Sequence, residues 1–82
     1  MERRQRLTLF SRPDFRGQSV TVTNSVTDMR RVGFMDRTGS AQAQGRWQVC
    51  SRTHFRGHCQ TVRGSERRLW MSTGRVASAR RM

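Results

Sequence analysis

Two cysteines and two histidines form the densest group of reactive side chains in the sequence. Cys50 and Cys59 flank the segment "SRTHFRGH", which contains His54 and His58. Thiolates and imidazoles bind Zn²⁺, but steps of four residues suit a helix, and this segment has the composition of a β-hairpin. In a hairpin centred on 54–55, the cysteines face each other on neighbouring strands, close to disulfide geometry. A zinc site is therefore disfavoured, while a disulfide and a pair of reduced thiols both remain open.

The sequence offers little else for catalysis. A nucleophile needs an adjacent base and a third group that orients the base, and no acidic residue lies near either histidine in the sequence. The acids are scattered, and no glycine-rich loop opens a helix, so neither paired carboxylates nor a phosphate-binding loop is indicated. The five acids are Glu2, Asp14, Asp28, Asp36 and Glu66. The sequence predicts a protein that is not an enzyme.

Arginine dominates the charge of the chain. The 82 residues include 17 arginines, no lysine and five acids, and the formal net charge is +12. Such a surface attracts phosphate groups and anionic membranes over roughly 8–10 Å, and a guanidinium can grip a phosphate with two hydrogen bonds. Lysine, isoleucine and tyrosine are all absent, so a compositional bias would also explain the arginines. A polyanion, either nucleic acid or an anionic cell surface, is one candidate partner.

The chain contains an internal repeat. Residues 11–25 align with 51–65, and identical residues stand at eight of the fifteen positions. Further on, "DRTGSA" (36–41) matches "GRVASA" (74–79), so the second copy is two residues shorter. A period near 40 indicates one supersecondary unit used twice. Two copies are too few for a solenoid, so we expect the two units to bury their faces against each other.

Each unit has the pattern of β-structure. Apolar and polar residues alternate in short segments that are separated by glycine or proline, and no segment has a clear helical period. Trp47 begins one of these segments and shares a face with Val49, as expected for a core anchor. The predicted strands are 7–11, 19–23, 40–44, 46–51 and 59–62. Even spacing of short strands indicates a single all-β sandwich or barrel.

An aromatic and glycine motif occurs in both copies. Phe10 is followed five residues later by Phe15 and then by Gly17, and Phe55 and Gly57 repeat the second half of the pattern. This spacing predicts a hairpin that folds back over its own sheet. A glycine can adopt positive φ and accept close approach by an aromatic ring.

This motif, the "GF-x-DR" element and the repeat together resemble the βγ-crystallin family, from about Leu7 to Arg81. The resemblance implies two intercalated Greek keys of four strands each, which form an eight-stranded β-sandwich. The first key would cover about 7–44 and the second about 46–81, after a basic tail at 1–6. In this family the motif residues are structural. They correspond here to Phe10, Phe15, Gly17, Trp47, Phe55 and Gly57.

Many microbial members of that family bind Ca²⁺ through the stretch (Asn/Asp)-(Asn/Asp)-x-x-(Ser/Thr)-Ser in each Greek key, and Ca²⁺ requires six to eight oxygen ligands. In the first stretch, residues 35–40, Asp36 and Ser40 keep the pattern, but a glycine replaces the hydroxyl residue at the fifth position. In the second stretch, residues 73–78, only Thr73 and Ser78 could contribute, and the fifth position is alanine. We expect calcium binding to be weak or lost, no cofactor to be required, and Ser40 and Ser78 to hydrogen-bond the backbone of a folded hairpin.

The sequence thus predicts a non-enzymatic structural or stability module with degenerate calcium sites. The alternative is a polyanion-binding protein with an arginine-rich surface on the same scaffold. No apolar run is long enough to span a membrane, and the basic start of the chain lacks the apolar region of an intact signal peptide. We expect a monomer or weak dimer. Export to the periplasm or the extracellular space is favoured if Cys50 and Cys59 are bridged.

Overall fold

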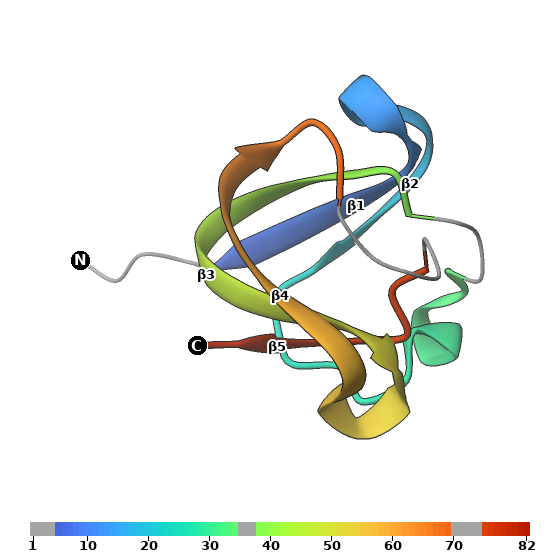
Figure 1. Ribbon diagram of the computed structural model, residues 1–82, viewed down its shortest axis with the longest axis vertical. Helices are drawn as coiled ribbons and strands as arrows, with labels where there is room; N and C mark the ends of the chain where they lie inside the picture. Colours follow the sequence, from blue (N-terminus) through green and yellow to red (C-terminus); the bar gives the residue numbers. More distant parts are fainter. Residues whose placement is uncertain (1–4, 35–37, 70–74) are drawn as a thin grey trace.

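The architecture is all-β, as the sequence predicts (Figure 1). The structure is a computed structural model that describes residues 5–34, 38–69 and 75–82. Its strands are β1 (Arg6–Arg12), β2 (Arg16–Val22), β3 (Ser40–Arg52), β4 (Arg56–Glu66) and β5 (Ser78–Arg81). Three short 3₁₀ turns complete the elements: η1 (Pro13–Phe15), η2 (Met29–Val32) and η3 (Thr53–Phe55). Of the tail predicted at 1–6, Arg6 belongs to β1, where it pairs with Gln44, and 1–4 lie outside the described residues.

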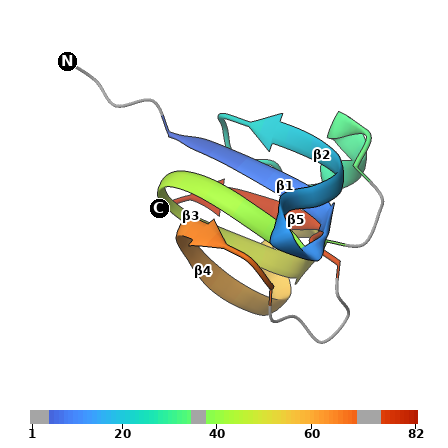
Figure 2. The ribbon, with the colours of Figure 1, turned by 90° about the horizontal axis from the view of Figure 1, so that it is seen from above.

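The strands pair in antiparallel fashion in the order β2-β1-β3-β4, and β5 also pairs with β3. The first part of β3 pairs with β1 and with the end of β4, whereas its second part pairs with the start of β4 and with β5. Figure 2 shows β1 and β2 on one side of the molecule and β4 on the other, with β3 curving between them. Through β3 the two halves of the sequence share one continuous ladder.

The prediction of separate strands at 40–44 and 46–51 is wrong, because both belong to β3. Gly45 has φ +83°, a left-handed conformation that suits glycine, and the register shifts between Ala43 and Arg46. The ladder continues past this irregularity, so Gly45 bends the strand without ending it. Gly64, with φ +67°, similarly lies within β4, which is longer than the predicted strand at 59–62.

The core consists of side chains that alternate inward along the strands, together with three from the connections. Trp47 is fully buried, and its indole Nε1–H donates a hydrogen bond to the carbonyl oxygen of Gln44 at 3.1 Å. Met29, Phe34 and Val76 reach the same interior from outside the strands. The full cluster is Leu7, Leu9, Val22, Met29, Phe34, Ala41, Trp47, Val49, Val62, Val76 and Ala79. One core therefore holds both halves of the chain together.

Candidate functional site

The two folded hairpins are the most unusual local structures in the molecule. In the first, Asp14 and Phe15 both have left-handed backbone conformations, with φ of 60° and 61°. His54 and Phe55 adopt the same conformation in the second hairpin, with φ of 59° and 61°. A bulky residue such as phenylalanine is rarely found there, and each left-handed residue costs roughly 1–2 kcal/mol. Specific contacts must therefore hold both hairpins.

The first of these contacts is aromatic. The rings of Phe10 and Phe15 meet edge to face, with centroids 5.6 Å apart and planes inclined by 69°. The second hairpin has Cys50 in place of Phe10, and Phe55 instead packs against the guanidinium of Arg80, which lies 5.3 Å from the ring centroid. Each phenylalanine thus has a partner on a neighbouring strand, although the chemistry differs between the two hairpins.

Two buried serines hold the hairpins in place by hydrogen bonds to the backbone, and we call these bonds the serine locks. The Ser40 hydroxyl donates to the carbonyl oxygen of Arg12 at 2.6 Å and accepts from the amide of Phe15 at 2.9 Å. Ser78 makes the same pair of bonds in the second hairpin, to Arg52 at 2.6 Å and from Phe55 at 3.0 Å. Both serines are fully buried. Each hydroxyl closes its hairpin between the residue before the 3₁₀ turn and the left-handed phenylalanine.

The glycines of the motif have the positive φ that the sequence predicts, +82° at Gly17 and +81° at Gly57, but the group that approaches them most closely differs from the expected one. A Cβ on Gly17 or Gly57 would collide with the hydroxyl oxygen of Ser11 or Ser51, and no aromatic ring is among the closest groups. These hydroxyls accept hydrogen bonds from the amide of Gln18 at 2.9 Å and from the amide of His58 at 3.0 Å. The close approach that requires a glycine is therefore made by a serine hydroxyl and not by the predicted aromatic ring.

Ser11 and Ser51 are functional residues of the hairpins that sequence reasoning missed. The repeat contains the sequence pattern that points to them, because Ser11 and Ser51 are the first identical pair in the alignment of 11–25 with 51–65. An identical serine before an identical glycine could have indicated a hydroxyl that bonds across the turn.

The two stretches that resemble calcium motifs, 35–40 and 73–78, are only partly described. Asp36 and Thr73 lie outside the described residues, so their predicted roles remain predictions. Ser40 begins β3 and Ser78 begins β5, and each hydroxyl bonds the backbone of a different hairpin. Thr38 is buried, and its Oγ1 accepts a long hydrogen bond of 3.4 Å from the amide of Val76.

The fifth positions of the two stretches, Gly39 and Ala77, are built into the backbone network. A Cβ on Gly39 would collide with the backbone of Arg12 and Pro13. The Gly39 carbonyl accepts from the amide of Leu69 at 3.0 Å, and the Ala77 carbonyl accepts from the amide of Met29 at 2.7 Å. A hydroxyl side chain at position 39 would thus require the start of the first hairpin to move.

Cys50 and Cys59 form a disulfide and stand opposite each other on β3 and β4. The disulfide alternative is thereby confirmed over the free thiols. Bridged cysteines cannot serve as thiolate ligands or nucleophiles, so the bridged form has neither the zinc site nor a Cys–His pair. Within 5–34, 38–69 and 75–82, no group of three or more His, Cys, Asp or Glu side chains is placed to hold a metal ion.

Two of the acids are neutralised by arginine. Asp28 accepts from the backbone and side chain of Arg30, and these hydrogen bonds, chiefly that of the side chain, lower the Asp28 pKa to about 2. Asp14 forms an ion pair of 2.9 Å with Arg67. Both carboxylates are therefore already paired with arginine side chains of the same chain.

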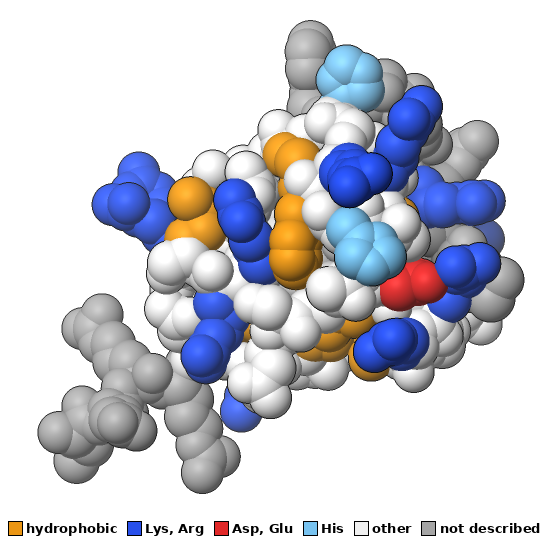
Figure 3. Space-filling view, turned by 90° about the horizontal axis from the view of Figure 1, so that it is seen from below, with side chains coloured by type: hydrophobic (Ala, Val, Ile, Leu, Met, Phe, Trp, Pro, Cys, Tyr) orange, Lys and Arg blue, Asp and Glu red, His pale blue; other side chains and the backbone are white. Residues whose placement is uncertain are grey.

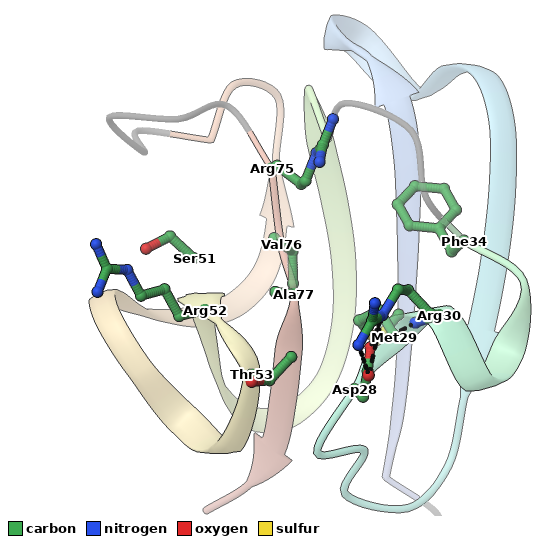
Figure 4. Close-up of a pocket in the computed structure, with 10 residues that line it drawn as sticks. All are labelled: Asp28, Met29, Arg30, Phe34, Ser51, Arg52, Thr53, Arg75, Val76 and Ala77. Atoms are coloured by element: carbon green, nitrogen blue, oxygen red, sulfur yellow. Dashed lines mark hydrogen bonds and ion pairs between the residues drawn. The ribbon is translucent and has the colours of Figure 1, made fainter.

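A pocket of about 430 Å³ lies beside the Asp28–Arg30 pair (Figure 4). Its lining combines the apolar side chains of Met29, Phe34 and Val76 with hydroxyls, arginines and the Asp28 carboxylate, and no lining residue is a histidine or cysteine.

The comparisons with known proteins agree with this geometry. The family model described as Beta/Gamma crystallin matches residues 6–82, which is nearly the whole chain. The chain belongs to the βγ-crystallin family. No curated protein sequence matches this βγ-crystallin.

Several solved structures share the fold of this βγ-crystallin. A βγ-crystallin from Ciona intestinalis superimposes with a TM-score of 0.85 at 22% identity, over 94% of this chain and 99% of that one. The N-terminal domain of Protein S gives 0.77 at 21% identity, over 92% of each chain. A βγ-crystallin domain from Flavobacterium johnsoniae gives 0.74 at 19% identity, over 90% of each. At these identities the similarity establishes the fold alone.

The disulfide is expected to contribute substantially to the stability of this βγ-crystallin. It closes a loop with a sequence separation of 9, and a loop of that length is worth about 2–3 kcal/mol. Reduction should lower the melting temperature by about 10–20 °C, since about 4–8 °C corresponds to 1 kcal/mol in a domain of this size. Calorimetry with and without reductant measures the effect.

The variant Cys50→Ala/Cys59→Ala is the control for reduction, because its melting temperature should not respond to reductant. Complete reduction of the wild type, verified by thiol titration, without a change in melting temperature would contradict this prediction.

Proposed function

We propose that this βγ-crystallin is a non-enzymatic structural module whose calcium sites are weak or lost and whose fold is stable without a metal ion. The observation that carries the proposal is the pair of serine locks. Ser40 and Ser78 fix the hairpins to the protein's own backbone, at the bonds described above. No cation is needed to hold either hairpin in its left-handed conformation.

The chemistry of the two stretches that resemble calcium motifs supports the same proposal. Ca²⁺ requires several oxygen ligands to repay its dehydration, and neither Gly39 nor Ala77 has a side-chain oxygen. Gly39 also has no room for one. The net charge of +12 repels a divalent cation as it approaches. Each of these factors lowers the affinity for calcium.

The proposal includes two intercalated Greek keys, about 7–44 and 46–81, that form an eight-stranded sandwich. Its support is a set of backbone bonds that recur forty residues apart. The amide of Asp14 donates to the carbonyl oxygen of Arg67 at 3.0 Å, and the amide of His54 donates to that of Thr27 at 2.8 Å. A bridge also joins Val26 to Ala79. In each case a segment of one half completes a structure of the other half.

A comparison of thermal stability with and without calcium tests the calcium part of the proposal. For a Kd weaker than about 5 mM, about 5 mM Ca²⁺ should stabilise the protein by less than about 0.5 kcal/mol. The melting temperature in calcium should therefore lie within about 3 °C of that in chelator. Mg²⁺ at equal ionic strength controls for the general effect of salt. A rise of 10 °C or more, specific to Ca²⁺, would overturn the proposal.

Polyanion binding is a second candidate, and one feature of the sheet favours it. Three pairs of arginines stand directly opposite each other on neighbouring strands: Arg12 and Arg16, Arg52 and Arg56, and Arg46 and Arg63. Like charges at such positions are destabilising unless an anion relieves them. On the face shown in Figure 3, arginine side chains clearly predominate over acidic ones. Retention on an immobilised polyanion that falls steeply with salt would support this candidate, and indifference at physiological salt would exclude it.

A further inference from the structure

The second half of the sheet presents an arginine-rich outer surface. Along β3 and β4, Trp47, Val49 and Val62 are buried on the inner side, so the residues between them face outward. Gln48 pairs with both Thr61 on β4 and Arg80 on β5, so the three strands present one continuous surface. We call this surface the arginine face. Its members are Arg46, Gln48, Thr61, Arg63 and Arg80.

Arg46 and Arg63 lie directly opposite each other at one end of the arginine face. Among the residues that the structure describes, no hydrogen bond or ion pair holds either guanidinium. The two side chains line a shallow hollow of about 580 Å³ together with Thr61, Glu66 and Met82. Glu66 is the acid on the rim of this hollow, and it makes no ion pair with either arginine. Two adjacent guanidiniums and a hydroxyl around one hollow can bind an oxyanion group between them.

Arg80 extends the positive charge toward the other end of the arginine face. Its side chain is held in one orientation before any ligand binds. Its Nε–H donates to the side-chain oxygen of Gln48 at 2.8 Å, and its guanidinium lies over the ring of Phe55. A side chain that is already ordered loses little entropy when it binds a ligand. The arginine face therefore combines an unpaired, like-charged pair with a third arginine held in place.

The corresponding surface on the first half of the sheet carries fewer arginines: Arg6 stands at the place of Arg46, and Thr23 stands at the place of Arg63. The pair Thr8 and Thr21 on β1 and β2 occupies the place of Gln48 and Thr61, and its hydroxyls lie 2.9 Å apart. Gln42 pairs with Thr8 where Arg80 pairs with Gln48. The second surface thus has three outward arginines, Arg46, Arg63 and Arg80, where the first has Arg6.

We propose that the arginine face binds a linear sulfated polysaccharide, with a sulfate group bridging Arg46 and Arg63. This inference rests on the second candidate function and names its surface and partner. The disulfide is expected of an oxidising compartment such as the extracellular space, and sulfated polysaccharides occur there. Single-stranded nucleic acid is usually bound by stacking on exposed aromatic rings. The described aromatic side chain that adjoins this surface is Phe55, and the Arg80 guanidinium already lies over its ring.

The test compares two double variants that remove equal charge. Arg46→Gln/Arg63→Gln changes the arginine face, whereas Arg12→Gln/Arg16→Gln changes a cross-strand pair beside the first hairpin. Binding to heparin, a sulfated polysaccharide, is measured by calorimetry across a series of salt concentrations. The first variant should bind about tenfold or more weakly near 0.15 M salt, with a log–log salt slope smaller by about two. The second should change affinity by about twofold, through its effect on net charge alone.

Each outcome bears on a different claim. Equal losses in the two variants, with both melting temperatures near that of the wild type, would overturn the arginine face but leave polyanion binding in place. Absence of heparin binding by the wild type at 0.15 M salt would overturn polyanion binding itself. Tighter binding to a single-stranded oligonucleotide than to heparin of equal charge would replace the polysaccharide with nucleic acid as the partner.

Discussion

Replacing Ser40 and Ser78 together by alanine is expected to leave the domain largely unfolded at room temperature. Each substitution deprives a partly buried backbone amide and a carbonyl of their hydroxyl partner. An unsatisfied buried polar group costs about 1–3 kcal/mol, so each serine is worth about 2–4 kcal/mol. The double variant then loses about 4–8 kcal/mol, which is comparable to the total stability of a small domain. Urea unfolding followed by circular dichroism measures the single variants and sets the expectation for the double.

The control is Ser19→Ala/Ser65→Ala, which removes two exposed hydroxyls from β2 and β4. Exposed serines without a structural bond should contribute within about 0.5 kcal/mol each. If the double variant at Ser40 and Ser78 were as stable as this control, the hairpins would be held by something other than the serine locks.

Truncation of Trp47 is the second large effect we expect. Trp47 is the largest fully buried side chain, and Leu7, Val49 and Val62 belong to the same buried cluster. Trp47→Ala should lower the free energy of unfolding by about 3–5 kcal/mol, because the core cannot collapse fully around so large a loss. Chemical denaturation followed by circular dichroism is the appropriate measurement, since the substitution also removes a fluorophore.

Trp47→Phe separates the two contributions of the indole. It keeps most of the apolar volume but removes the hydrogen bond to the Gln44 carbonyl, so it should cost about 1–3 kcal/mol. A cost for Trp47→Ala below about 1 kcal/mol would show that this residue does not anchor the core.

Much of the fold could be predicted from the sequence, because its signals are local and occur twice. The alternation around Leu7 and Leu9, and again around Trp47 and Val49, gave the correct inner faces of β1 and β3. The position of Cys50 and Cys59 on either side of a short turn placed them in register for the observed disulfide. These features depend on the two-residue period of a strand and on the length of a turn, both of which can be read without the tertiary structure.

Other features depend on long-range contacts and could not be predicted. A glycine between two predicted strands indicates a turn, but Gly45 adopts positive φ within a register shift, and β3 continues through it. The steric need for Gly39 becomes visible only when the backbone of Arg12 and Pro13 is placed against it. The opposition of Arg46 and Arg63 likewise follows from the register of β3 and β4 and not from either strand alone.

Isothermal titration of the chelator-treated protein with Ca²⁺ tests the central claim, a calcium-independent βγ-crystallin scaffold, most directly. We predict no saturable heat at calcium concentrations up to about 1 mM, because the serines already hold both hairpins and the fifth positions lack oxygen ligands. Saturable binding of one or two calcium ions with a Kd in the micromolar range or tighter would contradict it.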